Sequence, residues 1–125
     1  MTEKRLHLAV CKYLKFQYPD IYFLSDPSGL KMSIGMATQL KKTRSKHAQL
    51  DVVILEPNET SNGLILEIKK DRNQVYKKDG ELRNNEHVKK QSKSIAHLKN
   101  KDYICEYIFN LDEAIEIITK YLKTE

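Results

Sequence analysis

Two short apolar segments, each bordered by a carboxylate, constrain the fold of this chain more than any other feature. The apolar segment 64–66 runs directly into Glu67-Ile68-Lys69, and sixteen residues upstream of Glu67, Asp51 opens a second apolar segment. Side chains alternate between the two faces of a strand, so Glu67 and Lys69 are expected to point the same way. If the two strands pair, the carboxylates of Asp51 and Glu67 can converge, because neighbouring strands lie only ~4.8 Å apart.

Two carboxylates and an ammonium at the end of paired strands can hold a divalent metal and a phosphate. Oxygen ligands suit a hard cation such as Mg²⁺ or Mn²⁺. Each residue also has a purely structural interpretation. Asp51 could make a turn hydrogen bond where a strand begins, and Glu67 could lie on an edge strand paired with Lys69. A lone carboxylate at the end of an apolar strand is costly to bury, so the pair together favours metal binding.

Length and composition indicate one globular domain that covers residues 1–125. Lys and Arg number 22 against 17 Asp and Glu, giving a formal charge of +5, and this basic balance favours polyanionic partners. No apolar run approaches the ~20 residues that a membrane span needs, and the first residues show no signal-peptide pattern. Cys11 and Cys105 are far apart and lack metal-type spacing, which fits a reducing cytoplasm.

The hydrophobic pattern predicts the element order helix, strand, strand, strand, helix, strand, helix. The expected helices are 2–18, 84–100 and a last helix capped by Asn110 and Glu113, and the expected strands are 21–24, 50–55, 64–69 and 103–109. Residues 25–49 have little pattern beyond a short helical turn at 37–40. A right-handed crossover through the second helix would place the fourth strand in the same sheet as the third. The predicted fold class is α/β, a small mixed sheet flanked by helices, with an extra C-terminal helix.

Asp51 followed by Glu67-Ile68-Lys69 on a hairpin resembles the active site of the PD-(D/E)xK nuclease superfamily. Within it the chain is most similar to the VRR-NUC group, which includes small stand-alone phage and bacterial members. The pieces that carry this resemblance are Glu3, Ser25-Asp26-Pro27-Ser28-Gly29, Asp51, Glu67-Ile68-Lys69, Gln91 and the tail from Phe109 through Leu122. The family has Pro-Asp where this chain has Leu50-Asp51, and a preceding Gly where it has Ala48 or Gln49.

The resemblance implies a restriction-endonuclease-like αβββαβ core and a Mg²⁺- or Mn²⁺-dependent deoxyribonuclease that hydrolyses phosphodiester bonds. Asp51 and Glu67, with the backbone carbonyl of Ile68, would hold the metal, and Glu3 is a weaker additional ligand candidate. Lys69 would orient the attacking water or offset charge on the phosphate. The expected location is the cytoplasm of a bacterial or phage-infected cell.

Gln91 falls on the apolar face of its predicted helix, between Val88 and Ile95. A polar side chain on such a face needs a hydrogen-bond partner. From the residues alone, Gln91 is equally well interpreted as a satisfied core amide or as a contact to the site or to a phosphate. The resemblance to the nuclease family favours a role in the site.

A basic run directly before Asp51 is the expected DNA-binding segment. Its cations are Lys41, Lys42, Arg44 and Lys46, with Lys31 further upstream. Lys and Arg contacts to phosphates would bind DNA without reading its sequence. The same run could instead be an ordinary solvated loop. Lys89, Lys90 and Lys93 could extend the track, although on a helix they fit an ordinary polar face.

Three alternatives stay open at this level. The chain could be a resolvase of Holliday junctions or other branched DNA, with the same chemistry on a particular DNA shape. It could be a catalytically inactive nucleic-acid-binding module, although the intact Asp51, Glu67 and Lys69 argue against that. It could also be a basic protein that binds an acidic partner. A domain this small covers little duplex, so a homodimer is plausible.

Overall fold

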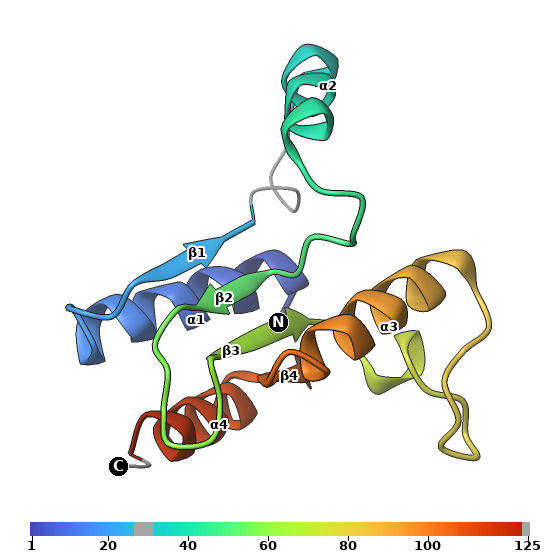
Figure 1. Cartoon of the computed structure of the whole chain (residues 1–125). Coiled ribbons are helices and arrows are strands. Elements are labelled where there is room, and N and C mark those ends of the chain that lie inside the picture. Colours follow the sequence, from blue (N-terminus) through green and yellow to red (C-terminus); the bar gives the residue numbers. More distant parts are fainter. Residues whose placement is uncertain (27–31, 124–125) are drawn as a thin grey trace.

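The computed structural model describes residues 1–26 and 32–123, and it contains a sheet flanked by helices (Figure 1). In chain order the elements are α1 (Glu3–Gln17), β1 (Phe23–Ser25), α2 (Ile34–Thr43), β2 (Val52–Ile54), β3 (Gly63–Ile68), η2 (Arg72–Gln74), α3 (Glu86–Lys99), β4 (Tyr103–Ile108) and α4 (Leu111–Lys123). The predicted order of helices and strands is confirmed, with α2 and the 3-10 helix η2 as additions.

The four strands form one mixed sheet in the order β1-β2-β3-β4. The pairs β1–β2 and β2–β3 are antiparallel, whereas β3 and β4 are parallel. The parallel pair is joined through α3, as the crossover argument predicts. All six residues of β3 are buried, because this central strand is covered on both faces.

The faces of β3 alternate between two hydrophobic clusters. Leu64, Leu66 and Ile68 pack with residues of α1 and α4. Ile65 instead belongs to a smaller cluster with residues of α3 and β4. Because alternate residues share a face, Glu67 and Lys69 continue the side of the sheet that carries α3. The side chains of Glu67 and Lys69 therefore face α3.

Hydrogen-bonding side chains define where the helices begin. Thr2 Oγ1 accepts the Arg5 N–H at 3.1 Å, as expected for the cap of α1. Asn110 Oδ1 accepts the Glu113 N–H at 2.9 Å, and Glu113 Oε1 accepts from Asn110 Nδ2 at 3.0 Å. The predicted cap of α4 is therefore confirmed, and these polar side chains satisfy groups that helix ends leave unpaired.

Gly63 allows β2 and β3 to approach each other closely where the hairpin closes. A Cβ atom at this position would lie 2.7 Å from the carbonyl oxygen of Ile54. Any other residue would have to push the strands apart, because real Cβ atoms do not approach backbone oxygen so closely. The glycine thus supports the hairpin that aligns Asp51 with Glu67.

The structure corrects the sequence-based interpretation of residues 25–49. Where a short turn at 37–40 was expected, the ten-residue helix α2 forms, capped by Ser33 Oγ, which accepts the Met36 N–H at 3.1 Å. Helix α2 has no buried residue and stands apart from the rest of the molecule, at the top of Figure 1. Hydrophobic periodicity cannot reveal a helix that buries no face, which explains the error. Lys41 and Lys42 therefore lie on a helix and not in a loop.

The strands β1 and β2 are shorter than predicted. The expected strand 50–55 is reduced to Val52–Ile54, and 21–24 becomes Phe23–Ser25. Asp51 lies just outside β2, where its N–H donates to the Glu67 side chain instead of to a backbone carbonyl. Within the described residues, no helix has the length and apolar character that crossing a bilayer requires.

Candidate metal and phosphate site

Asp51 and Glu67 face each other across the end of the β2–β3 hairpin. The strand register pairs Val52 with Leu66, and one step further along the hairpin it places Asp51 opposite Glu67. At this position, hydrogen bonds from backbone N–H groups to the two carboxylates replace the backbone-to-backbone hydrogen bonds of a regular strand pair. The Asp51 N–H donates to Glu67 Oε1 at 3.0 Å, and the Ile68 N–H donates to Asp51 Oδ2 at 2.8 Å. The predicted convergence of the two carboxylates is therefore present.

Burial raises the pKa of both carboxyl groups in this pair. Glu67 is only 5% exposed. Burial, and next the charge of Asp51, raise the pKa of Glu67 to about 8. Burial also raises the pKa of Asp51, against the lowering effect of its bond from the Ile68 N–H. Burial of Glu67 and the neighbouring charge of Asp51 thus both disfavour the ionised form of Glu67.

Lys69 and Gln91 complete the cluster around Glu67. Lys69 is 7% exposed, and its Nζ lies 3.6 Å from Glu67 Oε2. Gln91, on α3, is 3% exposed and donates its Nε2 to the same Glu67 oxygen. The Oε1 atom of Gln91 is buried and has no hydrogen-bond partner in the described part of the chain. The structure thus brings together the four residues that the sequence analysis singled out for catalysis.

A pocket of about 380 Å³ lies beside Asp51, between α1 and the ends of the strands, and Glu67 is not among its lining residues. Asp51 and Ile68 line it from the sheet, while Glu3 and His7 line it from α1. Glu3 Oε1 accepts the Lys70 N–H at 3.1 Å, so the weaker ligand candidate lies at the border of the site. The pocket offers space next to Asp51 in which a phosphate or a hydrated cation can be accommodated.

The donor set fits a hard divalent cation that keeps part of its water shell. No group of three His, Cys, Asp or Glu side chains among residues 1–26 and 32–123 is arranged to hold a metal by itself. Mg²⁺ usually uses one or two carboxylates together with waters and substrate phosphates. Asp51 and Glu67 are such a pair, and burial, and next the charge of Asp51, raise the pKa of Glu67, so a cation beside the pair would favour its ionised form. The Ile68 carbonyl could add a third oxygen.

The residues of the basic run lie in different environments. Lys41 and Lys42 are exposed in the last turn of α2, and Lys46 is exposed in the following loop. Arg44 instead makes an ion pair with Asp26, with Nη2 and Oδ1 2.5 Å apart. Lys31 and the segment Pro27-Ser28-Gly29 lie outside the described residues. Three of the four cations are thus exposed to solvent, whereas Arg44 connects the end of α2 to the end of β1.

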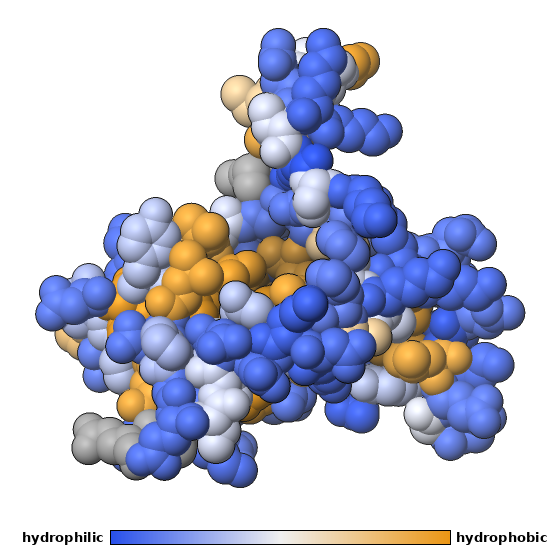
Figure 2. All heavy atoms as spheres, viewed as in Figure 1, coloured by the Kyte–Doolittle hydropathy of each residue, from blue (hydrophilic) through white to orange (hydrophobic). Residues whose placement is uncertain are grey.

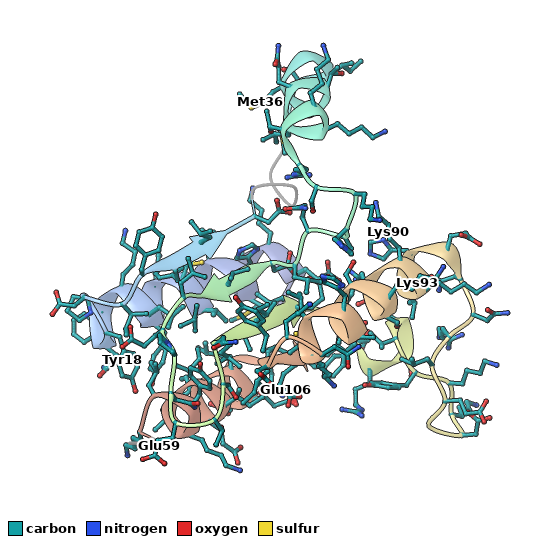
Figure 3. All side chains as sticks on the ribbon, viewed as in Figure 1. Tyr18, Met36, Glu59, Lys90, Lys93 and Glu106 are labelled. Carbon is teal, nitrogen blue, oxygen red and sulfur yellow. The ribbon has the colours of Figure 1, made fainter. Side chains whose placement is uncertain are left out.

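Further exposed lysines lie on α3, which also supplies Gln91. Lys89, Lys90 and Lys93 are all exposed, and Lys90 and Lys93 are labelled on this helix in Figure 3. Figure 2 shows mostly hydrophilic spheres over both α2 and α3 in this view. The hydrophilic surface therefore extends over the two helices that flank the loop leading to Asp51.

Two contacts near the site were not expected from the sequence. His87 Nε2 lies 3.2 Å from Lys69 Nζ, although the sequence analysis gave this histidine no role. His7 Nε2 lies 2.7 Å from Ser25 Oγ. Of these two contacts, the sequence could have indicated only that of His87. His87 lies four residues before Gln91, so the two side chains share one face of the helix.

Comparison with known proteins bears on the fold. No protein-family model matches this chain, and no curated protein matches it in sequence. Among solved structures, one described as "VRR_NUC domain protein" superimposes with a TM-score of 0.69 at 23% identity, over 98% of this chain and 89% of that chain. The predicted fold class is thereby confirmed: this chain has the fold of a VRR_NUC domain protein.

Proposed function

We propose that this protein is a Mg²⁺- or Mn²⁺-dependent nuclease that hydrolyses phosphodiester bonds in DNA. The observation that carries the proposal is the pair formed by half-buried Asp51 and buried Glu67, which face each other with Lys69 beside them. The similarity in fold to a protein described as a VRR_NUC domain protein supports the same conclusion. The PD-(D/E)xK pattern of these residues agrees with this chemistry.

The roles of the residues follow from their contacts. Asp51, Glu67 and the Ile68 carbonyl would hold the cation, which when bound activates a water molecule and offsets charge on the phosphate. Lys69 places an ammonium next to this oxygen cluster, where it can orient the water or offset phosphate charge. Gln91 fixes the Glu67 carboxylate through its Nε2 donor. No side chain is required as a covalent nucleophile.

DNA would approach along the lysines of α2 and α3. Lys41, Lys42 and Lys46 precede Asp51, and the α3 lysines follow the site in sequence. Exposed ammonium groups that contact phosphates hold a backbone without selecting a base sequence. The ion pair between Arg44 and Asp26 would keep the basic helix α2 attached to the strand end next to the site.

The test is a cleavage assay on linear, nicked and four-way-junction DNA with Mg²⁺, Mn²⁺ or EDTA. We expect cleavage with either metal and none with EDTA. Asp51→Asn and Glu67→Gln should fold and bind DNA but lose cleavage and Mn²⁺ binding in calorimetric titration. Glu106→Gln, an exposed substitution on the neighbouring strand β4, is the matched control.

Three outcomes would overturn the proposal. Metal-independent cleavage, or no cleavage of any of the three DNA forms, would remove the assigned activity. Wild-type Mn²⁺ binding in both carboxylate variants would show that the metal is held elsewhere. Preference for the four-way junction over linear DNA would instead identify the branched-DNA resolvase as the specific form of the same activity.

A further inference from the structure

Two side-chain contacts join helix α3 to the end of strand β3. The distance between the two contacts is similar along the helix and along the strand. Four residues of a helix rise ~6 Å, and two residues of a strand extend ~6.6 Å. Gln91 donates to Glu67, and four residues earlier His87 contacts Lys69, which lies two residues after Glu67. One face of α3 therefore contacts both functional side chains at the end of β3, each through its own partner.

The chemistry of this second contact fixes the state of His87. A lysine ammonium has three donors and no acceptor, so Nε2 of His87 must accept the hydrogen bond from Lys69 Nζ at 3.2 Å. The histidine is then neutral, with its proton on Nδ1. Partial removal from water on the side that faces Lys69, and next the charge of Lys69, lower the pKa of His87, while Glu3 and Asp51 raise it and Lys90 lowers it further.

Lys69 needs such a partner because of its surroundings. It is 7% exposed, and its ion pair with Glu67 is long, at 3.6 Å. An ammonium with Glu67 as its sole partner would move onto the carboxylate, where it would compete for the oxygen that Gln91 also binds. A neutral acceptor at 3.2 Å, closer to Nζ than the Glu67 oxygen at 3.6 Å, holds the ammonium without adding charge to the site.

We propose that His87 is a positioning residue, which accepts a hydrogen bond from Lys69 and holds its ammonium away from the Glu67 carboxylate. The inference rests on the proposed nuclease function, since it assigns His87 a part in the same reaction. His87 does not itself touch the metal ligands or the phosphate. Its effect on cleavage passes entirely through Lys69.

The test is a double-mutant cycle of His87→Ala and Lys69→Ala, measured as single-turnover cleavage at saturating Mn²⁺ and DNA. His87→Ala should slow cleavage by about tenfold or more, because a small misplacement of a reacting group can cost ~100-fold. The same substitution in the Lys69→Ala background should cause no further loss. His87→Gln, which keeps a neutral acceptor, should restore most of the rate.

Three further measurements separate positioning from a structural effect. Mn²⁺ affinity, DNA affinity and melting temperature should stay at wild-type values in His87→Ala, because the side chain is exposed and binds neither ligand. His97→Ala is the matched control. His97 lies on the same helix, but its ring stacks on His47 and it does not contact Lys69. This control should cleave at the wild-type rate.

The outcomes distinguish the two hypotheses. If the wild type cleaves DNA with Mn²⁺ but His87→Ala cleaves equally fast, the positioning role is wrong and the nuclease function stands. Equal loss from His87→Ala in the wild-type and Lys69→Ala backgrounds would also overturn it, because the two residues would then act independently. If the wild type itself shows no metal-dependent cleavage, the proposed function fails first.

Discussion

At the residue scale, the site is a set of buried polar groups that depend on one another. Glu67 accepts hydrogen bonds from the Asp51 N–H and from Gln91, and it pairs with Lys69. Such a cluster is expensive to form unless every member has a partner. The raised pKa of Glu67 shows that, in the absence of a cation, the cluster does not fully stabilise a second carboxylate charge.

A pH dependence of stability follows from this pKa. In the folded chain Glu67 has a pKa of about 8, above its ordinary value of 4.5. Its favourable contribution is therefore complete below pH ~4.5 and is lost as pH rises through about 8. The metal-free protein should lose stability between pH 5.5 and pH 9, by a few kcal/mol at most from this group, since one pKa unit corresponds to ~1.4 kcal/mol.

Urea unfolding in EDTA across this pH range checks the prediction. Glu67→Gln should flatten the decline, because it removes the titrating group, while the exposed control Glu106→Gln (Figure 3) should keep it. Mn²⁺ should restore wild-type stability at pH 9 by binding the ionised form. A pH profile that is identical in wild type and Glu67→Gln would show that Glu67 does not titrate in this range.

Lys69 is expected to act on the reaction and not on the cation. Lys69→Met keeps a long apolar side chain but removes the charge, so Mn²⁺ binding should persist. Single-turnover cleavage should fall by about 100-fold or more, which is the usual effect of removing one group that stabilises charge in the transition state. Calorimetry and rapid-quench kinetics measure the two effects separately. An unchanged rate would identify Lys69 as a structural ion-pair partner of Glu67 only.

At the element scale, α2 is the helix that buries none of its residues. It contributes nothing to the hydrophobic clusters, and its exposed residues include Ile34 at 89% and Met36 at 57%, the latter labelled in Figure 3. A helix without tertiary packing gains little stability from its sequence alone. Its capping Ser33 and the ion pair of Arg44 hold it at its two ends.

The proposed DNA-binding role of this region predicts a salt effect. Replacing Lys41, Lys42 and Lys46 by Gln should weaken binding equally on unrelated duplexes and lower the log–log salt slope by ~0.9 for each lost phosphate contact. Mn²⁺ affinity should not change. Fluorescence anisotropy over a salt series measures the slope, and the matched variant replaces Lys89, Lys90 and Lys93. If only the α3 variant changes the slope, DNA binds along α3 instead of α2.

At the scale of the whole molecule, one small domain presents the carboxylate site at one end of its sheet. Under the proposed function, one such site would cut one strand at a time, whereas cutting both strands, or both sides of a junction, would require two sites. A homodimer would bring two copies of the site to one DNA molecule.

We therefore expect the protein to assemble in pairs. Sedimentation equilibrium should give twice the 14.6 kDa mass of the chain, and four-way junctions should be cut on two strands. A mass of 14.6 kDa at all concentrations, with single nicks as the product, would show that the monomer is the active form.

The sequence by itself determined the order of the elements, the mixed sheet and the alignment of Asp51 with Glu67. These features depend on local periodicity, because alternation within a strand decides which residues share a face. Glu67 and Lys69 could thus be assigned to one face from their spacing alone. The cap of α4 was equally local, since Asn110 and Glu113 bond within a single turn.

Only the tertiary structure decided which groups from distant elements meet. The contacts of His87 with Lys69 and of Arg44 with Asp26 join residues 18 positions apart, and the periodicity of a single element does not identify the partner in another element. The full length of helix α2 was not predicted because the helix buries no face. Strand β2 begins after Asp51 because the Asp51 N–H donates to the Glu67 side chain and not to a backbone carbonyl of β3. Contacts between side chains of distant elements depend on how the helices pack against the sheet. The hydrophobic pattern of the sequence indicates only which face of each element becomes buried.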